Sequence, residues 1–405
     1  MKSRLLYIVL ILFFAATALI WFVWPTKEPQ SKAQNMTLKA IDFAELPHWN
    51  SSSLIHSLKT FQISCRCFLK QNPERPVGNQ WFALQAKDWF PACKAALSID
   101  PKNAQQAQHF FENWFQPAEF YQNNTLTGLF TGYYVPEIEA SLHKTTEYNV
   151  PIYGTPTNLV KIDLNTFDPT LPTRQLWGRL EHNRMVPFYS REEIDQGAIQ
   201  HVAPIIAYIR SPIDRLFIEV QGSALLSLQD GTKLNLGYSG KNGLPYTAIG
   251  RVLMDRGILN YDTLSKQNIE AYLNAHPEET NDILHKNRSF VFFKPLAENG
   301  AFGSQGVPLT PGYSLAVDLN WVPIGMPIWL NTTFPDPQQT THHSLNRLMI
   351  AQDTGGAIKG TVRGDVFWGN GEDAAAIAGK MKNTGRYWLL IPKAAFKQIA
   401  LAKSY

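Results

Sequence analysis

From about residue 127 onward, the chain consists of short apolar runs bounded by Gly, Pro, Asn or Asp, and this pattern constrains the fold more than any other feature. Runs of this length and spacing are typical of β-strands separated by turns. The predicted strands are Leu216 to Val220, Ser289 to Lys294, Ser314 to Asp318, Pro327 to Leu330, Arg347 to Ala351 and Tyr387 to Ile391. Such a density of short strands favours β-barrels over a parallel α/β sheet. We therefore expect a mainly β protein.

Helical periodicity occurs before the strands and at interruptions among them. Apolar residues recur every three or four positions from Leu54 to Phe68, and a second helix is predicted from an N-cap at Asp100 to a breaker at Pro117. Further helices are predicted at Tyr246 to Arg256, at Ser265 to Ala275 and from Glu372 onward. At 405 residues, the chain is long enough for two domains.

The N-terminus carries an uncharged apolar run, Leu5 to Trp24, which is long enough to span a bilayer. The run ends in bulky residues and not in a small-residue cleavage site, which favours an uncleaved signal anchor. Lys2 and Arg4 precede it, so the positive-inside rule places the rest of the chain on the outer side of the membrane. We expect a transmembrane signal anchor at 1–24 and a polar linker at 25–46.

Composition narrows the range of partners. Lys and Arg total 37 against 33 for Asp and Glu, without a basic block, so nucleic acid is not an expected partner. The three cysteines form neither a disulfide framework nor a zinc pattern, although Cys93 could pair with Cys65 or Cys67 in an oxidising compartment. The 11 Trp, 15 Tyr and 23 Phe are expected mostly in cores, with a few as platforms for sugar rings.

The densest group of chemically suggestive residues lies between 347 and 373, where several glycines surround the acids Asp353 and Asp365. Each acid is next to strand-like residues, and acids on glycine-bounded loops at strand ends are frequent in catalytic sites. An acid in such a position can instead simply cap a turn. The residues by themselves leave both interpretations open.

The sequence does not match the catalytic motifs of several other enzyme classes. Asp353 begins an Asp-Thr-Gly, as in the aspartic proteases, but these enzymes share a proton between two such acids and the chain has no second copy. The sequence has no His-Glu-x-x-His, no Walker A loop and no Gly-x-Ser-x-Gly. We therefore expect neither a metal nor a cofactor.

Two further segments, 219–250 and 130–141, combine glycines with polar and aromatic residues. The candidates for substrate binding are Gln221, Gly222, Ser223 and Tyr238 in the first segment and Thr131 and Tyr133 in the second. Amide, hydroxyl and aromatic groups of this kind suit sugar hydroxyls and acetamido groups. The alternative for the first segment is a pair of ordinary hairpin turns.

Five motifs, in this order, resemble the MltA family of membrane-bound lytic murein transglycosylases. They are FTGYY at 130–134, VQGS at 220–223, SFVFF at 289–293, the stretch from 306 to 330, and DTGGAIKG at 353–360. The resemblance covers about 130 to 392. It implies two β domains with a groove between them. A double-psi β-barrel domain with N-terminal helices would comprise 47–140 and 287–405, and a smaller inserted β-barrel domain 141–286.

The resemblance also implies cleavage of the β-1,4 bond between N-acetylmuramic acid and N-acetylglucosamine in peptidoglycan, leaving a 1,6-anhydromuramoyl end. The family's catalytic acid matches Asp365 and its second acid matches Asp353. Asp365 would act as general acid and then as base, which requires a pKa raised above about 3.9. We expect Asp353 and Thr131 to support Asp365, and Gln221, Gly222 and Ser223 to hold the sugars.

Family members are often outer-membrane lipoproteins, whereas this chain has no Cys directly after its apolar run that could carry a lipid. We therefore expect anchoring in the inner membrane, with the catalytic part in the periplasm. The expected partners are peptidoglycan glycan strands, with cell-wall synthesis or remodelling proteins as further candidates. The alternative function is a non-catalytic peptidoglycan-binding protein that uses the same groove.

Overall fold

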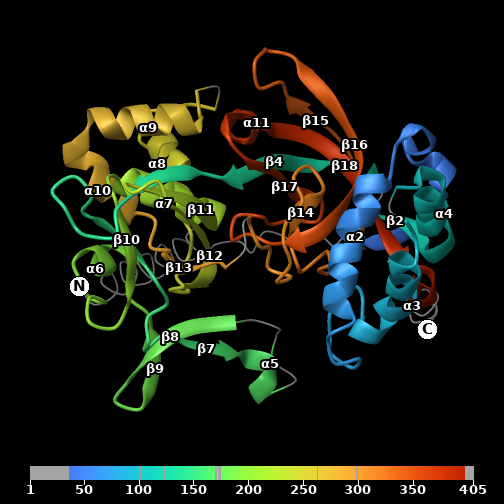
Figure 1. The fold of residues 1–405 in the computed structure, drawn as a ribbon, viewed down its shortest axis with the longest axis horizontal. Coiled ribbons are helices and arrows are strands. Elements are labelled where there is room, and N and C mark those ends of the chain that lie inside the picture. The colour runs from blue at the N-terminus through green and yellow to red at the C-terminus, as the bar shows by residue number, and fades with distance from the viewer. Residues whose placement is uncertain are drawn as a thin grey trace, which may run out of the picture.

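The computed structural model describes residues 36–396, except 101, 123, 169–170, 172–174, 262 and 298–299 (Figure 1). The described chain forms two bodies side by side, one around a closed barrel and the other, from the middle of the sequence, around smaller sheets. The predicted membrane anchor lies outside the described residues. Within them, no helix is long and apolar enough to cross a membrane.

The barrel is a ring of six described strands in the order β18–β15–β16–β14–β17–β4, which the pairing of β4 with β18 closes. The strands are β4 (Gly128–Val135), β14 (Ser314–Val317), β15 (Pro327–Pro335), β16 (His342–Asp353), β17 (Arg363–Asn370) and β18 (Lys382–Pro392). Two pairings are parallel, β14 with β16 and β17 with β4, and parallel neighbours require crossover connections. The predicted fold class, mainly β with N-terminal helices and a barrel, is confirmed.

Three strands extend this sheet beyond the ring. β2 (Phe115–Gln122) pairs with β18, and both β1 (Thr37–Ala40) and β3 (Asn124–Thr125) pair with β2. The polar linker expected at 25–46 therefore ends sooner than the sequence suggests. The reason is that Leu38 packs against the barrel core and Ile41 is buried in it.

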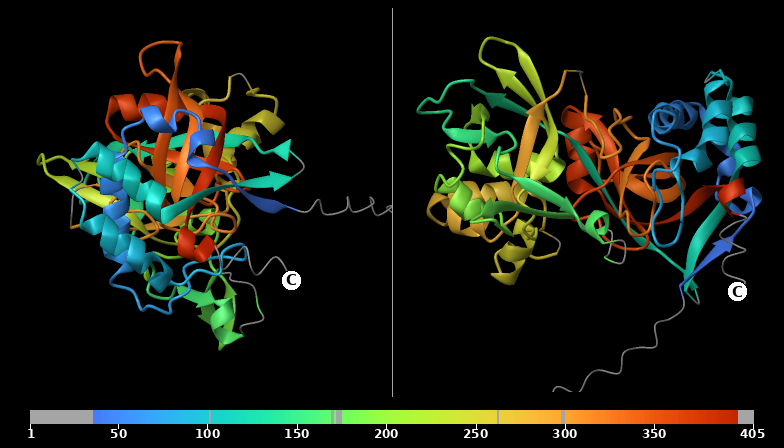
Figure 2. Two further views of the ribbon diagram at one scale, coloured as in Figure 1. Left: turned by 90° about the vertical axis from the view of Figure 1, so that its right-hand side faces the viewer. Right: turned by 90° about the horizontal axis from the view of Figure 1, so that it is seen from below.

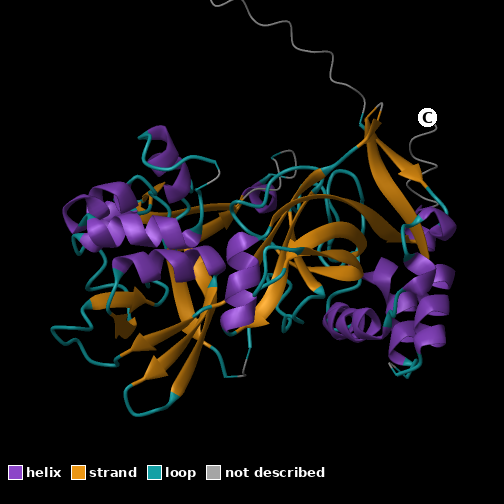
Figure 3. Ribbon diagram, turned by 90° about the horizontal axis from the view of Figure 1, so that it is seen from above, coloured by secondary structure: helices purple, strands orange, loops and turns teal. Residues whose placement is uncertain are grey.

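Three helices cover one side of the barrel: α2 (Ile55–Phe68), α3 (Ala86–Leu97) and α4 (Ala104–Trp114). Figure 3 shows them at one end of the molecule, with strands between them and the helices of the other body. The stripe predicted from Leu54 to Phe68 forms α2, and its apolar residues are fully buried. Helix α4 was expected to have its N-cap at Asp100. It begins later because Asn103 is the N-cap, where its side chain accepts the Gln106 N–H.

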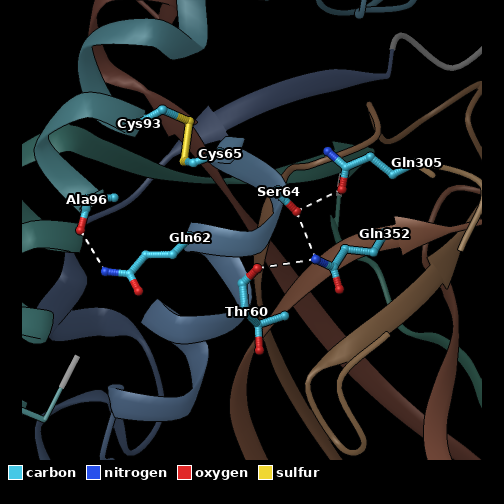
Figure 4. Close-up of a disulfide and its surroundings, with 8 residues drawn as sticks. All are labelled: Thr60, Gln62, Ser64, Cys65, Cys93, Ala96, Gln305 and Gln352. Carbon is cyan, nitrogen blue, oxygen red and sulfur yellow. Dashed lines mark hydrogen bonds between the residues drawn. A yellow bond between two sulfur atoms is a disulfide. The ribbon is translucent and has the colours of Figure 1, made fainter. Parts of the chain in front are cut away.

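A disulfide between Cys65 and Cys93 joins α2 to α3, and Cys67 is free (Figure 4). The structure thus selects one of the two pairings that the sequence left open. The spacing of Cys65 on the buried stripe and of Cys93 on the buried face of α3 brings their Cα atoms to 4.9 Å.

Removal of this disulfide should lower the free energy of unfolding by about 3 kcal/mol, because the bond closes a loop spanning 28 residues in the unfolded chain. Chemical denaturation of a Cys65→Ser variant measures the effect. Cys67→Ser is the matched control, because Cys67 lies two residues after Cys65 on the same helix and takes no part in the bond. An equal loss in the control would contradict the assignment.

The described residues of the second body form three sheets. β13–β12–β11–β5 form the largest, β10 pairs with β6, and β7–β8–β9 form an arm that projects from the molecule (Figure 2). Their bounds are β5 (Glu137–Ala140), β6 (Val150–Tyr153), β7 (Val160–Asp163), β8 (Gln175–Glu181), β9 (Arg184–Pro187), β10 (Ile205–Ile209), β11 (Ser223–Leu228), β12 (Lys233–Lys241) and β13 (Val291–Pro295). The helices are α5 (Leu164–Phe167), α6 (Arg191–Asp195), α7 (Pro212–Gln221), α8 (Ile249–Asp255), α9 (Lys266–Ala275) and α10 (Pro277–His285).

One strand prediction is wrong, because Leu216 to Val220 belongs to helix α7. Ser211 caps this helix by accepting the N–H groups of residues 213 and 214, and Pro212 occupies its first turn, where a missing N–H has no cost. Gly222 ends it in the left-handed conformation, with φ of 75°. These end signals outweigh the β-branched composition of the segment.

Candidate active site

Asp353 and Asp365 lie in one row across the barrel sheet. Ala316 on β14 pairs with Asp353 of β16 on one side and with Asp365 of β17 on the other, and Asp365 pairs in turn with Thr131 of β4. Residues opposite one another on adjacent strands share a face of the sheet. The small alanine therefore separates two carboxyl side chains on the same face, and a hydroxyl flanks the second.

The Asp365 carboxyl group is held by a hydrogen bond from Thr131, whose Oγ1 lies 2.5 Å from Oδ1. Arg363 donates in turn to the same Oγ1, from Nη2 at 2.7 Å. Among the described residues, the second carboxyl oxygen of Asp365 makes no hydrogen bond. Asp365 thus has one oxygen fixed and one oxygen available to a ligand.

Burial raises the pKa of Asp365, against the opposing effects of the Arg363 charge and the Thr131 hydrogen bond. Phe367, two residues after Asp365, packs against Tyr133 with ring centroids 5.2 Å apart. Val366 instead faces the barrel core, because alternate residues of a strand point to opposite faces. Since desolvation disfavours the ionised form, the direction is the one that a general acid requires.

Asp353, at the end of β16, is surrounded by hydrogen-bond donors. Its Oδ1 accepts the backbone N–H groups of Ser304 and Thr354, both at 2.9 Å, and its Oδ2 accepts the Tyr133 hydroxyl at 2.9 Å. Burial nevertheless raises its pKa to about 6, and the neighbouring Asp365 charge acts in the same direction. Asp353 is therefore a fixed carboxyl group whose oxygens are already engaged.

An Asp353→Asn variant should be more stable than the unaltered chain at neutral pH, by about 1 to 2 kcal/mol after allowance for its partial exposure. The folded pKa of about 6 lies above the unfolded value, so ionisation opposes folding. The contribution of Asp353 to stability is therefore most favourable below about pH 4, declines between about pH 4 and 6, and stays low at higher pH. Thermal melts at pH 4 and 7.5 test this, because the gain should vanish at pH 4.

The sequence did not reveal what its FTGYY motif packs against. Gly132 of β4 lies under Trp368, so a Cβ atom there would approach the indole ring to 2.7 Å. The Tyr133 hydroxyl, which we expected to contact substrate, is directed at Asp353. The helix α11 (Glu372–Lys380), whose start at Glu372 was predicted, also lies against β4.

The VQGS segment connects the two bodies. Gln221 at the end of α7 accepts the backbone N–H of Tyr134 through Oε1 at 3.0 Å, so it meets the same strand that carries Thr131. Ser223 is buried and opens β11, whereas Tyr238 on β12 is 44% exposed. Of these predicted residues, Tyr238 is the accessible aromatic group, and Gln221 bridges the bodies.

Two lysines near the site make contacts that the sequence did not reveal. The Nζ atom of Lys359 lies 3.7 Å from Asp318 Oδ1. Lys266 at the start of α9 donates to the Tyr134 hydroxyl at 3.1 Å, a contact with no local sequence signal. Among the described residues, no group of three or more His, Cys, Asp or Glu side chains is arranged to hold a metal ion.

A pocket of about 490 Å³ lies on the second body and not beside the two acids. Its lining includes Thr155, Ser239 and Lys294. None of the predicted site residues lines this pocket, and its lining contains no carboxyl group that could transfer a proton. The row that contains Asp353 and Asp365 is therefore the better candidate for an active site.

Comparison with known proteins points to one family. Residues 129–294 match the MltA specific insert domain, and residues 313–391 match the 3D domain. Membrane-bound lytic murein transglycosylase A of Escherichia coli K12 is 36% identical over 264 residues, which are 64% of this chain and 65% of that protein. The matched region thus spans slightly less than two thirds of this curated relative.

Solved structures cover more of the chain. MltA from Neisseria gonorrhoeae is 31% identical with a TM-score of 0.71, over 88% of this chain and 93% of that one. The membrane-bound lytic murein transglycosylase of Agrobacterium tumefaciens is 29% identical with a TM-score of 0.78, over 90% and 99%. E. coli MltA with bound chitohexaose is 28% identical with a TM-score of 0.58, over 81% and 90%. The chain belongs to the MltA family.

Proposed function

We propose that this protein is a lytic transglycosylase, which cleaves the β-1,4 bond between N-acetylmuramic acid and N-acetylglucosamine in peptidoglycan and leaves a 1,6-anhydromuramoyl end. The observation that carries the proposal is the contrast between the two acids. Asp353 has its oxygens engaged by three donors, whereas Asp365 keeps one oxygen without a described partner. Asp365 is therefore the acid available to a glycosidic oxygen.

A single available carboxyl group suits this reaction. Ordinary glycosidases use two, one to protonate the leaving oxygen and one as nucleophile or as base for water. In the proposed reaction the muramoyl C6 hydroxyl attacks C1 and water is not consumed. Asp365 gives its proton to the leaving oxygen and, as the carboxylate, takes one from the C6 hydroxyl, so the acid is regenerated. Burial raises the pKa of Asp365, which favours the protonated form that starts the reaction.

The other site residues would position this acid and its substrate. Thr131 fixes one oxygen of Asp365, and Asp353 discourages ionisation of Asp365 when it carries a charge itself. In this proposal the glycan lies between a barrel domain of residues 47–140 and 287–405 and an inserted domain of residues 141–286. Gln221, Gly222, Ser223 and Tyr238 of the inserted domain would hold the sugars from the opposite side. The similarity to an MltA structure with bound chitohexaose supports a glycan ligand.

Digestion of purified peptidoglycan with the detergent-extracted full chain tests the proposal. Mass spectrometry of the released fragments should show anhydromuramoyl ends, each one water lighter than the hydrolysis product. Fragments with reducing ends would indicate a hydrolase instead. Binding to sacculi without released fragments would favour the non-catalytic peptidoglycan-binding protein. N-terminal sequencing of the same extract tests whether the proposed inner-membrane anchor at 1–24 is uncleaved.

A further inference from the structure

Gln352, the residue before Asp353, has a fully buried side chain that makes three hydrogen bonds. Its Oε1 accepts the Ser314 hydroxyl at 2.5 Å. Its Nε2 donates to the Ser64 hydroxyl at 2.9 Å and to the Thr60 carbonyl at 3.2 Å, both on helix α2 (Figure 4). One amide therefore ties α2 to two strands of the barrel, β14 and β16.

The same network holds the loop that donates to Asp353. Ser64 passes its own hydroxyl hydrogen to Gln305 Oε1 at 2.7 Å, and the Gln305 backbone N–H donates to the Gln352 carbonyl at 3.1 Å. Ser304, one residue earlier, supplies the backbone N–H that Asp353 accepts. The position of this donor is thus set by the contacts of its neighbour with α2 and with Gln352.

The helix side of the network is itself fixed. Cys65 follows Ser64 directly, and its disulfide to Cys93 fastens α2 to α3 at this point. Figure 4 shows the disulfide and the amide network on neighbouring turns of α2. A rigid helix therefore presents Ser64 and Thr60 to Gln352.

We propose that Gln352 is a positioning residue, which uses the disulfide-anchored helix α2 to hold Ser304 and Asp353 in the geometry that the active site needs. The inference rests on the proposed function for its kinetic consequence. An apolar residue of similar size would leave Ser314, Ser64 and the Thr60 carbonyl without these partners in a buried place. Buried polar groups without partners drive local rearrangement, and the 303–306 loop is the part attached to them.

Gln352→Met tests the inference, because methionine keeps the length of the side chain and removes its hydrogen bonds. Gln62→Met is the matched control. Gln62 is also a buried glutamine, but it lies on α2 itself, and its Nε2 donates to the carbonyls of Ala96 and Ile99, away from the acids. Both variants lose buried amide contacts between helix and protein, so both should lower the melting temperature.

In the kinetic arm, Gln352→Met should reduce kcat for release of anhydromuropeptides by roughly tenfold with KM unchanged, which corresponds to the loss of about one hydrogen bond to a charged group. Gln62→Met should stay within about twofold of the unaltered protein at a temperature where both are folded. Equal effects of the two variants, or an effect on KM alone, would overturn the inference. If the unaltered protein releases no anhydromuropeptides, the proposed function fails instead.

A second readout does not depend on catalysis. An NMR titration of ¹³C-labelled aspartate side chains, with the Asp353 signal assigned by its absence in Asp353→Asn, reports the pKa of Asp353 directly. The other titratable groups acting on it, Tyr133 from β4 and Asp365 from β17, are the same in each variant. The pKa of Asp353 should rise in Gln352→Met, since the Ser304 N–H stabilises the carboxylate, and stay unchanged in Gln62→Met. An unchanged value in Gln352→Met overturns the inference.

Discussion

Asp365→Asn should release anhydromuropeptides roughly 10² to 10⁴-fold more slowly than the unaltered protein, because an amide can neither give nor take the proton in general acid and base catalysis. Asparagine keeps the size of the side chain and can still accept the Thr131 hydrogen bond. Initial rates of release from purified peptidoglycan, followed by mass spectrometry, measure the effect. The variant should bind sacculi as well as the unaltered protein does.

The same assignment predicts the direction of the pH dependence. The initiating form of Asp365 is protonated, so the rate should fall as pH rises through its pKa, which burial raises from the ordinary Asp value. Asp365→Asn should lack this limb in any remaining activity. An Asp365→Asn variant with full activity would show that another group carries the proton, even if the anhydromuramoyl product is confirmed.

Glu219→Met should destabilise the second body by about 3 to 5 kcal/mol, because it leaves buried arginines without their counter-charge. The side chains of Arg191 and Glu219 are 1% and 3% exposed. Arg191 Nη2 lies 2.5 Å from Glu219 Oε2, and Arg191 Nη1 lies 3.1 Å from Glu219 Oε1. Arg215 lies on the other side of Glu219, with Nε 3.7 Å from Oε1. Denaturant unfolding followed by tryptophan fluorescence measures the loss.

Glu139→Met provides the control, because Glu139 pairs with Arg210 at the exposed surface of the same body. Exposed pairs contribute at most about 1 kcal/mol, so this variant should unfold close to the unaltered protein. If both substitutions had the same small effect, the buried pair would contribute little to stability. Because Glu219 is two residues before Gln221, its loss should also weaken the junction between α7 and β4.

The sequence predicts the local elements of this fold better than their partners. The helix from Leu54 and the one capped by Ser265 form as expected, since periodicity and caps are local properties. The strand prediction for 216–220 fails because its β-branched residues favour a strand, while the helix end signals, Ser211 and Gly222, lie outside this segment. Pairing order, with β4 between β17 and β18, has no local signal at all.

In the candidate site, too, the sequence indicates single residues but not which residues they contact. Asp353 and Asp365 stand out by residue type, but their common row with Ala316 depends on two strand registers that periodicity does not specify. The bond from Thr131 to Asp365 joins positions 234 residues apart. The role proposed for Gln352 likewise has no local signal, because it depends on the packing of α2 against β16.

The closure of the barrel determines when the candidate active site can form during synthesis. Strand β4, which carries Thr131, gains its neighbours β17 and β18 only after roughly 260 further residues have been made, a delay of roughly 15 to 50 s at ordinary elongation rates. Until then, no paired strands hold Thr131 next to Asp365. The candidate active site is thus among the last parts of the described chain to be completed during synthesis.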